Sequence, residues 1–109
     1  MDIQTQPQPP IDGLSDAALE RWREINRDWI LELPQMMILA AALQSFDRMI
    51  QAKSIVDAEG LVVLDRFSQP RPHPACLIER DARHAMERAL KSLNLDLEAV
   101  GQIGRPTGS

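Results

Sequence analysis

The side chains that could carry catalytic or metal chemistry are few. His73 and Cys76 are three positions apart, and His84 follows eight residues after Cys76. A closed zinc site built on these residues would need a fourth ligand, and the chain has no second cysteine to supply it. A Cys–His nucleophile pair is possible, but Cys76 falls in the first turn of a predicted amphipathic helix, where a buried or half-buried thiol is expected. We expect no bound metal, and we expect His73 to be a capping or turn residue between two prolines.

No other catalytic constellation is present in the sequence. The glycines are scattered at positions 13, 60, 101, 104 and 108, so none of them forms a phosphate-binding loop. No pair of carboxylates stands in an apolar setting that would shift its pKa. We therefore expect that the chain is not an enzyme and that it needs no cofactor.

Arginine is the remaining residue type that could act at a site. The chain has 12 cationic residues, nearly all of them arginines, but 16 acidic residues give a net charge of −4. This charge argues against generic nucleic-acid coating and leaves room for local basic patches. One candidate phosphate-binding surface joins an exposed tip to the last helix and contains Arg66, Arg71, Arg80, Arg83 and Arg88, and we expect the first four of these to contact phosphate. A second cluster contains Arg21, Arg23 and Arg27. Because acids accompany both clusters, an ordinary solvated face is the alternative.

A long central helix must position most of these residues. From Gln35 to Glu59 there is neither Gly nor Pro, and most residues are good helix formers. Pro34 suits the first turn of a helix, and Gly60 suits its end. Roughly 25 residues make a rod about 37 Å long at 1.5 Å per residue.

The beginning of this helix is more apolar than an isolated chain needs. The stretch from Met36 to Leu43 is apolar on every face, whereas the second half has one apolar stripe. Large exposed apolar patches on proteins usually mark contacts with partners. We therefore expect a subunit interface that contains Trp29, Met36, Met37, Leu39 and Leu43. The alternative is that the first and last helices of the same chain bury this stretch.

The rest of the chain predicts a mostly α-helical domain. A first helix capped by Ser15 runs to Leu33 and places Trp22 and Trp29 on one core-facing stripe. Since its connection to the central helix is short, these two helices should form an antiparallel hairpin. Residues 61–64 predict a short strand, with a small hairpin across Ser68-Gln69. The last helix opens at Pro74.

The predicted boundaries follow from composition. Residues 1–14 are rich in proline and glutamine and predict a disordered arm, residues 15–98 form the helical domain, and residues 99–109 read as a flexible tail. The single cysteine fits a reducing compartment. The longest apolar run has eight residues, too few to span a membrane, and the amino terminus does not resemble a signal peptide. We expect an intracellular protein.

The order of these features resembles the small subunit of phage terminase, in the compact family without a separate helix-turn-helix head. The resemblance covers residues from about 15 to 106 and includes the Gly-Arg-Pro of residues 104–106. The matching residues are Leu19, Trp22, Trp29, Ala42, Arg48, Ala52, Gly60, Leu61, His73, Pro74, Ala75, Arg80, Leu90, Leu93 and Leu95.

This resemblance implies a viral or prophage DNA-packaging factor in the cytoplasm of a bacterial host. Members of the family are helical, assemble into rings, hold the packaging site on double-stranded viral DNA and stimulate the large subunit. The large subunit carries the ATPase and nuclease. Two other hypotheses remain: a small helical adaptor or antitoxin-like dimer that binds only protein, and a small redox or metal enzyme that uses Cys76 and His73.

Overall fold

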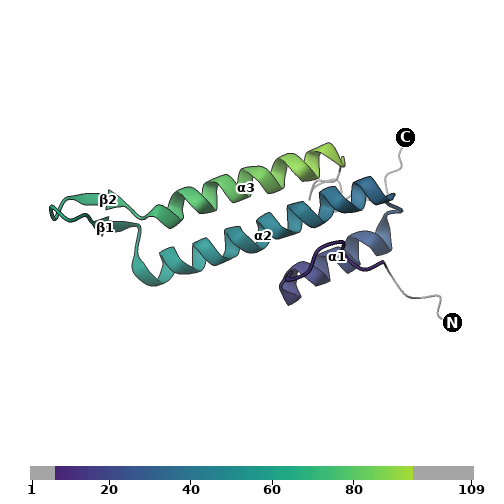
Figure 1. The fold of residues 1–109 in the computed structure, drawn as a ribbon, viewed down its shortest axis with the longest axis horizontal. Helices are drawn as coiled ribbons and strands as arrows, with labels where there is room; N and C mark the ends of the chain where they lie inside the picture. Colours follow the sequence, from purple (N-terminus) through teal and green to yellow (C-terminus); the bar gives the residue numbers. More distant parts are fainter. Residues whose placement is uncertain (1–6, 95–109) are drawn as a thin grey trace.

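Helix α2 (Leu33–Glu59) is the longest element of the fold, and the other two helices run antiparallel to it (Figure 1). Helix α1 (Asp16–Asp28) lies beside its first half, and α3 (Pro74–Ser92) lies along its other side. Strands β1 (Val62–Leu64) and β2 (Pro70–Pro72) form a hairpin between α2 and α3. The structure, a computed structural model, describes residues 7–94. The expected mostly α-helical fold, with antiparallel helices and a short β excursion, is confirmed.

The ends of α2 follow the signals in its sequence. Pro34 lies in the first turn, where its missing N–H removes no helical hydrogen bond. Just before the helix, the Glu32 N–H donates to Oε1 of Gln35 over 2.8 Å. At the other end Gly60 caps the helix with a φ of 92°, a conformation that side chains with a Cβ rarely adopt. The predicted long helix is therefore confirmed at both ends to within a residue or two.

Helix α1 ends earlier than the sequence predicted. It stops at Asp28, and Trp29 is extended, whereas the prediction continued the helix to Leu33. Because α2 begins at Leu33 and needs an extended cap residue at Glu32, the chain has to leave α1 several residues earlier to reverse its direction. The reversal leaves Ile30 98% exposed.

Part of the expected N-terminal arm packs against the helices. The indole Nε1 of Trp22 donates to the carbonyl oxygen of Pro7 over 2.7 Å, and Ile11 and Leu14 pack against the core. Ser15 then caps α1, because its Oγ accepts the N–H of Ala18 over 3.0 Å. Residues 1–6 of the predicted arm, and the predicted tail at residues 99–109, lie outside the described residues.

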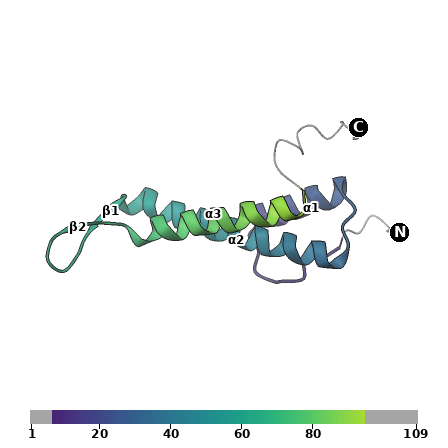
Figure 2. The same ribbon diagram turned by 90° about the horizontal axis from the view of Figure 1, so that it is seen from above.

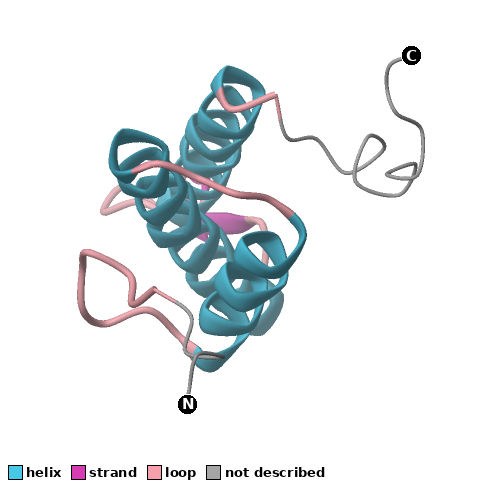
Figure 3. Cartoon of the chain, turned by 90° about the vertical axis from the view of Figure 1, so that its right-hand side faces the viewer, coloured by secondary structure: helices cyan, strands magenta, loops and turns pink. Residues whose placement is uncertain are grey.

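Two separate apolar clusters hold the helices together. The larger cluster lies where α1, α2 and the end of α3 meet; it contains Trp22 and Leu39, with Ala18, Ala40, Leu43 and Leu93. The predicted core position of Trp22 is thus confirmed. The smaller cluster lies between α2 and α3 near the hairpin and contains Ala52, Val56 and Ala75. Seen end-on, α2 lies between α3 and α1 (Figure 3).

The β-hairpin projects past the end of the α2–α3 pair (Figure 2). Its strands are antiparallel, with Val62 opposite Pro72, Val63 opposite Arg71 and Leu64 opposite Pro70. The connecting turn covers residues 65–69 and closes on a hydrogen bond of 3.0 Å from the Asp65 N–H to the Gln69 carbonyl oxygen. The predicted hairpin is confirmed. Across the described residues, none of the helices combines the length and apolar character required to cross a bilayer.

Candidate nucleic-acid and subunit interfaces

The turn of the β-hairpin is held in one shape by a single carboxylate. Oδ1 of Asp65 accepts the backbone N–H groups of Phe67 and Gln69 over 2.8 and 2.9 Å. Oδ2 accepts Nε of Arg71 over 3.0 Å. The backbone N–H of Gln69 and then the Arg71 guanidinium lower the pKa of Asp65, because both stabilise the charged carboxylate. The turn is therefore organised before it meets any partner.

This organised turn presents one cation and one aromatic ring to solvent. The guanidinium carbon of Arg66 lies 5.0 Å from the centroid of the Phe67 ring, within cation–π distance. Phe67 is 69% exposed, and Arg66 is exposed as well. Within residues 7–94, no carboxylate lies within ion-pairing distance of Arg66. Arg66 is thus the most available of the four predicted phosphate-binding arginines.

The other three predicted DNA-binding arginines each have an acidic neighbour. Nε of Arg71 lies 3.0 Å from Asp65. On α3, Arg80 lies 3.4 Å from Asp81, and Arg83 lies 3.8 Å from Glu79. The structure groups Arg66 with Arg71 on the hairpin and places Arg80 and Arg83 along α3. Their exposed ion pairs are weak, so a phosphate could compete for these guanidinium groups.

His73 connects the hairpin to both long helices. Its Nδ1 accepts the N–H of Ala75 over 3.0 Å and so caps α3. Its Nε2 lies 2.8 Å from Oε1 of Glu59 at the end of α2. Because Nδ1 accepts a backbone hydrogen, Nε2 carries the ring proton and donates it to the carboxylate. The predicted capping role of His73 is confirmed, and the thiol of Cys76 is half-buried as expected.

The α1–α2 junction carries exposed apolar side chains, which we call the apolar corner. It consists of Ile30, Leu33, Met37 and Ile38, which are 98%, 62%, 57% and 37% exposed. Met37 was predicted to lie in a subunit interface, and Ile38 falls within the stretch predicted to be apolar on every face. Ile30 and Leu33 were not singled out, because both were expected inside a continuous first helix.

The remaining predicted interface residues are covered by the chain itself. Leu39 and Leu43 are 0% and 5% exposed because α1 packs over them, so they leave no surface for a second copy. Trp29 and Met36 are partly buried against the same cluster. The start of α2 is therefore buried within the chain on the face that contacts α1, as the alternative interpretation expected. Its opposite face remains exposed.

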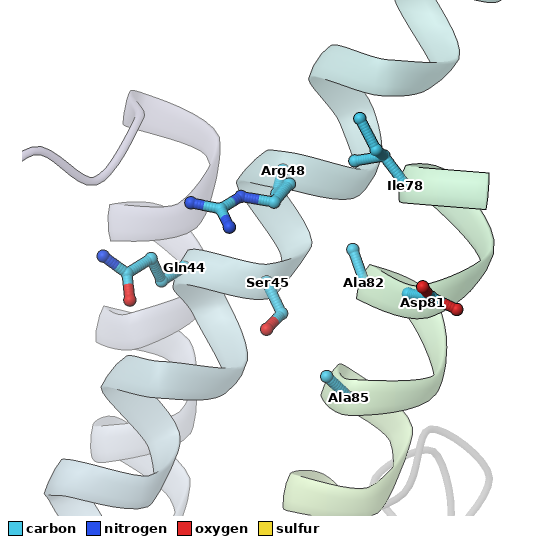
Figure 4. Close-up of a pocket in the computed structure, with 7 residues that line it drawn as sticks. All are labelled: Gln44, Ser45, Arg48, Ile78, Asp81, Ala82 and Ala85. Atoms are coloured by element: carbon cyan, nitrogen blue, oxygen red, sulfur yellow. The ribbon is translucent and has the colours of Figure 1, made fainter. Parts of the chain in front are cut away.

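A groove of about 330 Å³ runs between α2 and α3 (Figure 4). Small side chains point into it from the two helices: Ser45, Ala82 and Ala85. Gln44 and Arg48 lie on the α2 rim, with Ile78 and Asp81 on the α3 rim. Among the described residues there is no cluster of His, Cys, Asp and Glu able to hold a metal ion. The groove therefore combines a floor of small side chains with polar side chains on both rims.

The described residues thus present an apolar corner at the α1–α2 junction and an organised turn with an exposed arginine and an exposed aromatic ring at the β-hairpin. A family model for the small subunit of phage terminase matches residues 18–108. The chain therefore belongs to the phage terminase small-subunit family. Comparisons with curated proteins and with solved structures gave no match.

Proposed function

We propose that this chain assembles into a ring with copies of itself, holds packaging-site DNA of a phage or prophage, and stimulates the large terminase subunit. The large subunit supplies the ATPase and nuclease, and the small subunit itself has no catalytic activity. It works in the cytoplasm of the bacterial host. Family membership over residues 18–108 is the observation that carries this proposal.

The apolar corner supports assembly. A ring needs a head-to-tail contact between two different surfaces of each copy. The apolar corner is one of these surfaces. The second surface consists of exposed apolar residues farther along α2 and on α3. These are Ile50, Ile55, Leu77 and Ile78, which are 45%, 43%, 52% and 47% exposed. Water is expelled from both surfaces when copies join, which favours closure of the ring.

The turn of the β-hairpin supports DNA binding. Arg66 is exposed and preorganised, and it can approach a phosphate without first leaving a carboxylate within the described residues. Arg71, Arg80 and Arg83 are the further proposed phosphate contacts. A few arginines on one copy would make only a few phosphate contacts, but the same residues repeated around a ring would make many at once.

The DNA contact is tested by replacing Arg66 with Ala. Binding of double-stranded DNA should weaken, and the slope of log affinity against log salt should fall by about one for each phosphate that the protein no longer neutralises. Fluorescence anisotropy at several salt concentrations measures both quantities. Lys53→Ala is the control, because it removes one positive charge from an exposed α2 residue that belongs to neither candidate arginine cluster. Equal effects of the two substitutions would remove Arg66 from the proposed site.

The ring contact is tested with Met37→Glu. A buried charge at a subunit interface is costly, so this variant should dissociate into smaller species in native mass spectrometry. Ala17→Glu adds the same charge at an exposed position of α1 that belongs to neither proposed apolar surface, and it should leave the assembly unchanged. A wild-type protein that is monomeric at micromolar concentration would overturn the ring.

The alternative function is a small adaptor or antitoxin-like dimer that binds only protein. The acidic neighbours of Arg71, Arg80 and Arg83 favour it, since they offset much of the positive charge on the proposed DNA surface. A measured mass of two chains, together with no DNA binding at low salt, would select this alternative.

A further inference from the structure

The two outer edges of the β-hairpin differ in what they can bind. In an antiparallel pair, residues that exchange hydrogen bonds across the ladder alternate with residues whose N–H and C=O groups point outward. The bonds from His73 to Leu61 and from Asp65 to Gln69 fix which residues point inward. Val63 and Arg71 therefore face each other, whereas Pro70 and Pro72 occupy the outward positions of β2.

The outer edge of β2 is closed to a further strand. Proline has no N–H, so neither Pro70 nor Pro72 can donate to a neighbour. Prolines at such positions are a common means of preventing sheet extension. Any continuation of this sheet must therefore take place at β1.

Within residues 7–94, no strand pairs with the outer edge of β1. By the same alternation, Val62 and Leu64 direct their N–H and C=O groups away from β2, and the sheet described in residues 7–94 has only two strands. Their side chains are 55% and 66% exposed. An edge with free donors and acceptors and exposed apolar side chains is a template for pairing with another strand.

We propose that β1 of one copy pairs antiparallel with β1 of a second copy. In the register that uses every outward group, Val62 of each copy lies opposite Leu64 of the other, and the two Val63 residues face each other at the two-fold axis. This arrangement joins both outward residues of each strand through backbone hydrogen bonds and gives a single sheet in the order β2-β1-β1-β2. The contact is distinct from the proposed head-to-tail ring contact and does not depend on it.

A second copy suits this edge because the edge is complementary to itself. The donors and acceptors of Val62 and Leu64 form a pattern that a two-fold rotation matches, and isologous contacts of this kind are common between identical chains. The sheet then ends on both sides at the prolines of β2, so pairing stops at two copies. An isolated two-stranded hairpin is marginally stable in water, and the wider sheet relieves that weakness.

The apolar side chains favour the same pairing. Val62, Leu64, Pro70 and Pro72 lie on one face of the hairpin, because directly paired residues share a face. In the paired sheet, Val62 of one copy would contact Leu64 of the other, so both side chains would lose part of their present exposure.

Register-specific cross-linking of the full-length chain tests the proposal. In a Cys76→Ser background, Val63→Cys places two thiols at the non-bonded position on the two-fold axis, where Cα atoms lie about 4.5 Å apart and a disulfide can form. Mild oxidation should convert most of the protein to a covalent dimer. Arg71→Cys in the same background lies on the closed strand and should cross-link far less. Equal yields from the two variants, or no dimer from Val63→Cys, would overturn the pairing.

A backbone substitution provides the matched control. Leu64→Pro removes an outward N–H without removing a bond inside the hairpin, and it should abolish the Val63→Cys cross-link. Leu64→Val keeps that N–H and should retain the cross-link. Circular dichroism checks that both variants stay helical, and Val62→Pro repeats the test at the other outward position. Retention of the cross-link in both proline variants would overturn the proposal.

The same experiment separates this contact from the ring. If Met37→Glu dissolves the ring and Val63→Cys still cross-links in that variant, the strand pairing stands as an independent contact. A ring that persists in native mass spectrometry without any Val63→Cys dimer would leave the ring in place and remove the strand pairing.

Discussion

The two halves of the helical structure are built differently. Where α1 joins α2 and α3, the core contains large side chains, and Trp22 and Leu39 are fully buried. Toward the hairpin only α2 and α3 remain, and their shared cluster consists of Ala52, Val56 and Ala75. The three-helix half therefore buries large side chains. The two-helix half packs α2 against α3 through small residues and leaves larger apolar side chains exposed.

This difference concerns where the stability of the fold lies, since exposed apolar side chains occur in both halves. Burial of large side chains dominates the stability of a small domain, so the three-helix half should carry most of the free energy of unfolding. The two-helix half buries mainly small side chains between its helices and should contribute less. Substitutions in the two halves should therefore differ in how much they destabilise the fold.

Trp22→Ala should have the largest effect. Removing a fully buried Trp leaves a cavity and breaks the hydrogen bond to Pro7, and such changes cost about 3–5 kcal/mol. Chemical denaturation followed by circular dichroism measures the loss. Leu77→Ala, at a side chain that is 52% exposed in the other half, should change stability by less than about 0.5 kcal/mol. A similar loss for both would contradict the division between the halves.

Ala52→Leu should have the next largest effect, because it tests the close approach of α2 and α3. Ala52 is 3% exposed in the cluster between the two helices, so a larger side chain must push the helices apart at a cost of about 1–3 kcal/mol. Ala58→Leu, at an exposed position near the end of α2, is the control and should be close to neutral. Thermal unfolding of both variants would show whether small residues are required between the helices.

Asp47→Ala should have a smaller effect within the three-helix half. The Asp47 carboxylate accepts the N–H and the Oγ–H of Ser15 over 2.8 and 2.5 Å and so fixes the start of α1 to α2. Its loss should cost about 1 kcal/mol, the scale of a capping or side-chain hydrogen bond. Asp57→Ala removes the same charge from an exposed pair with Lys53 and should cost only tenths of a kcal/mol. Urea denaturation should resolve the two.

Acidification should have the smallest and most local effect. The pKa of Asp65 in the folded chain is below its ordinary value of 3.8, so its stabilisation of the turn is present above that value and is lost as the pH falls through the folded pKa. The amide resonances of Phe67 and Gln69 should shift in that acidic range by NMR, and in Asp65→Asn the same titration should disappear. Movement of the Trp22 indole resonance at the same pH would mean that the turn is coupled to the distant core.

Local signals predicted much of this fold. Pro34 and Gly60 marked the two ends of α2, and His73 between two prolines marked the cap of α3. The hairpin followed from a short apolar run before a proline-rich segment. Each of these signals acts through the backbone of its own segment, so a sequence is sufficient to read it.

The less predictable features depend on contacts between segments. Ile30 and Leu39 are equally apolar in sequence, yet one is exposed and the other is buried, because the reversal after Trp29 decides which face α1 covers. The packing of Ile11 and the bond from Trp22 to Pro7 likewise require a neighbour distant in the chain. The sequence also did not predict which arginines are available to bind phosphate, because that depends on which carboxylate each side chain reaches.

The uninterrupted length of α2 has a consequence for how the chain can be used. Its 27 residues form a rod about 40 Å long, with the apolar corner at its beginning and the hairpin beyond its end. Two neighbours can therefore occupy the ends at the same time without meeting. The number of turns in this one helix would then set the distance between a neighbour at the apolar corner and a neighbour at the hairpin.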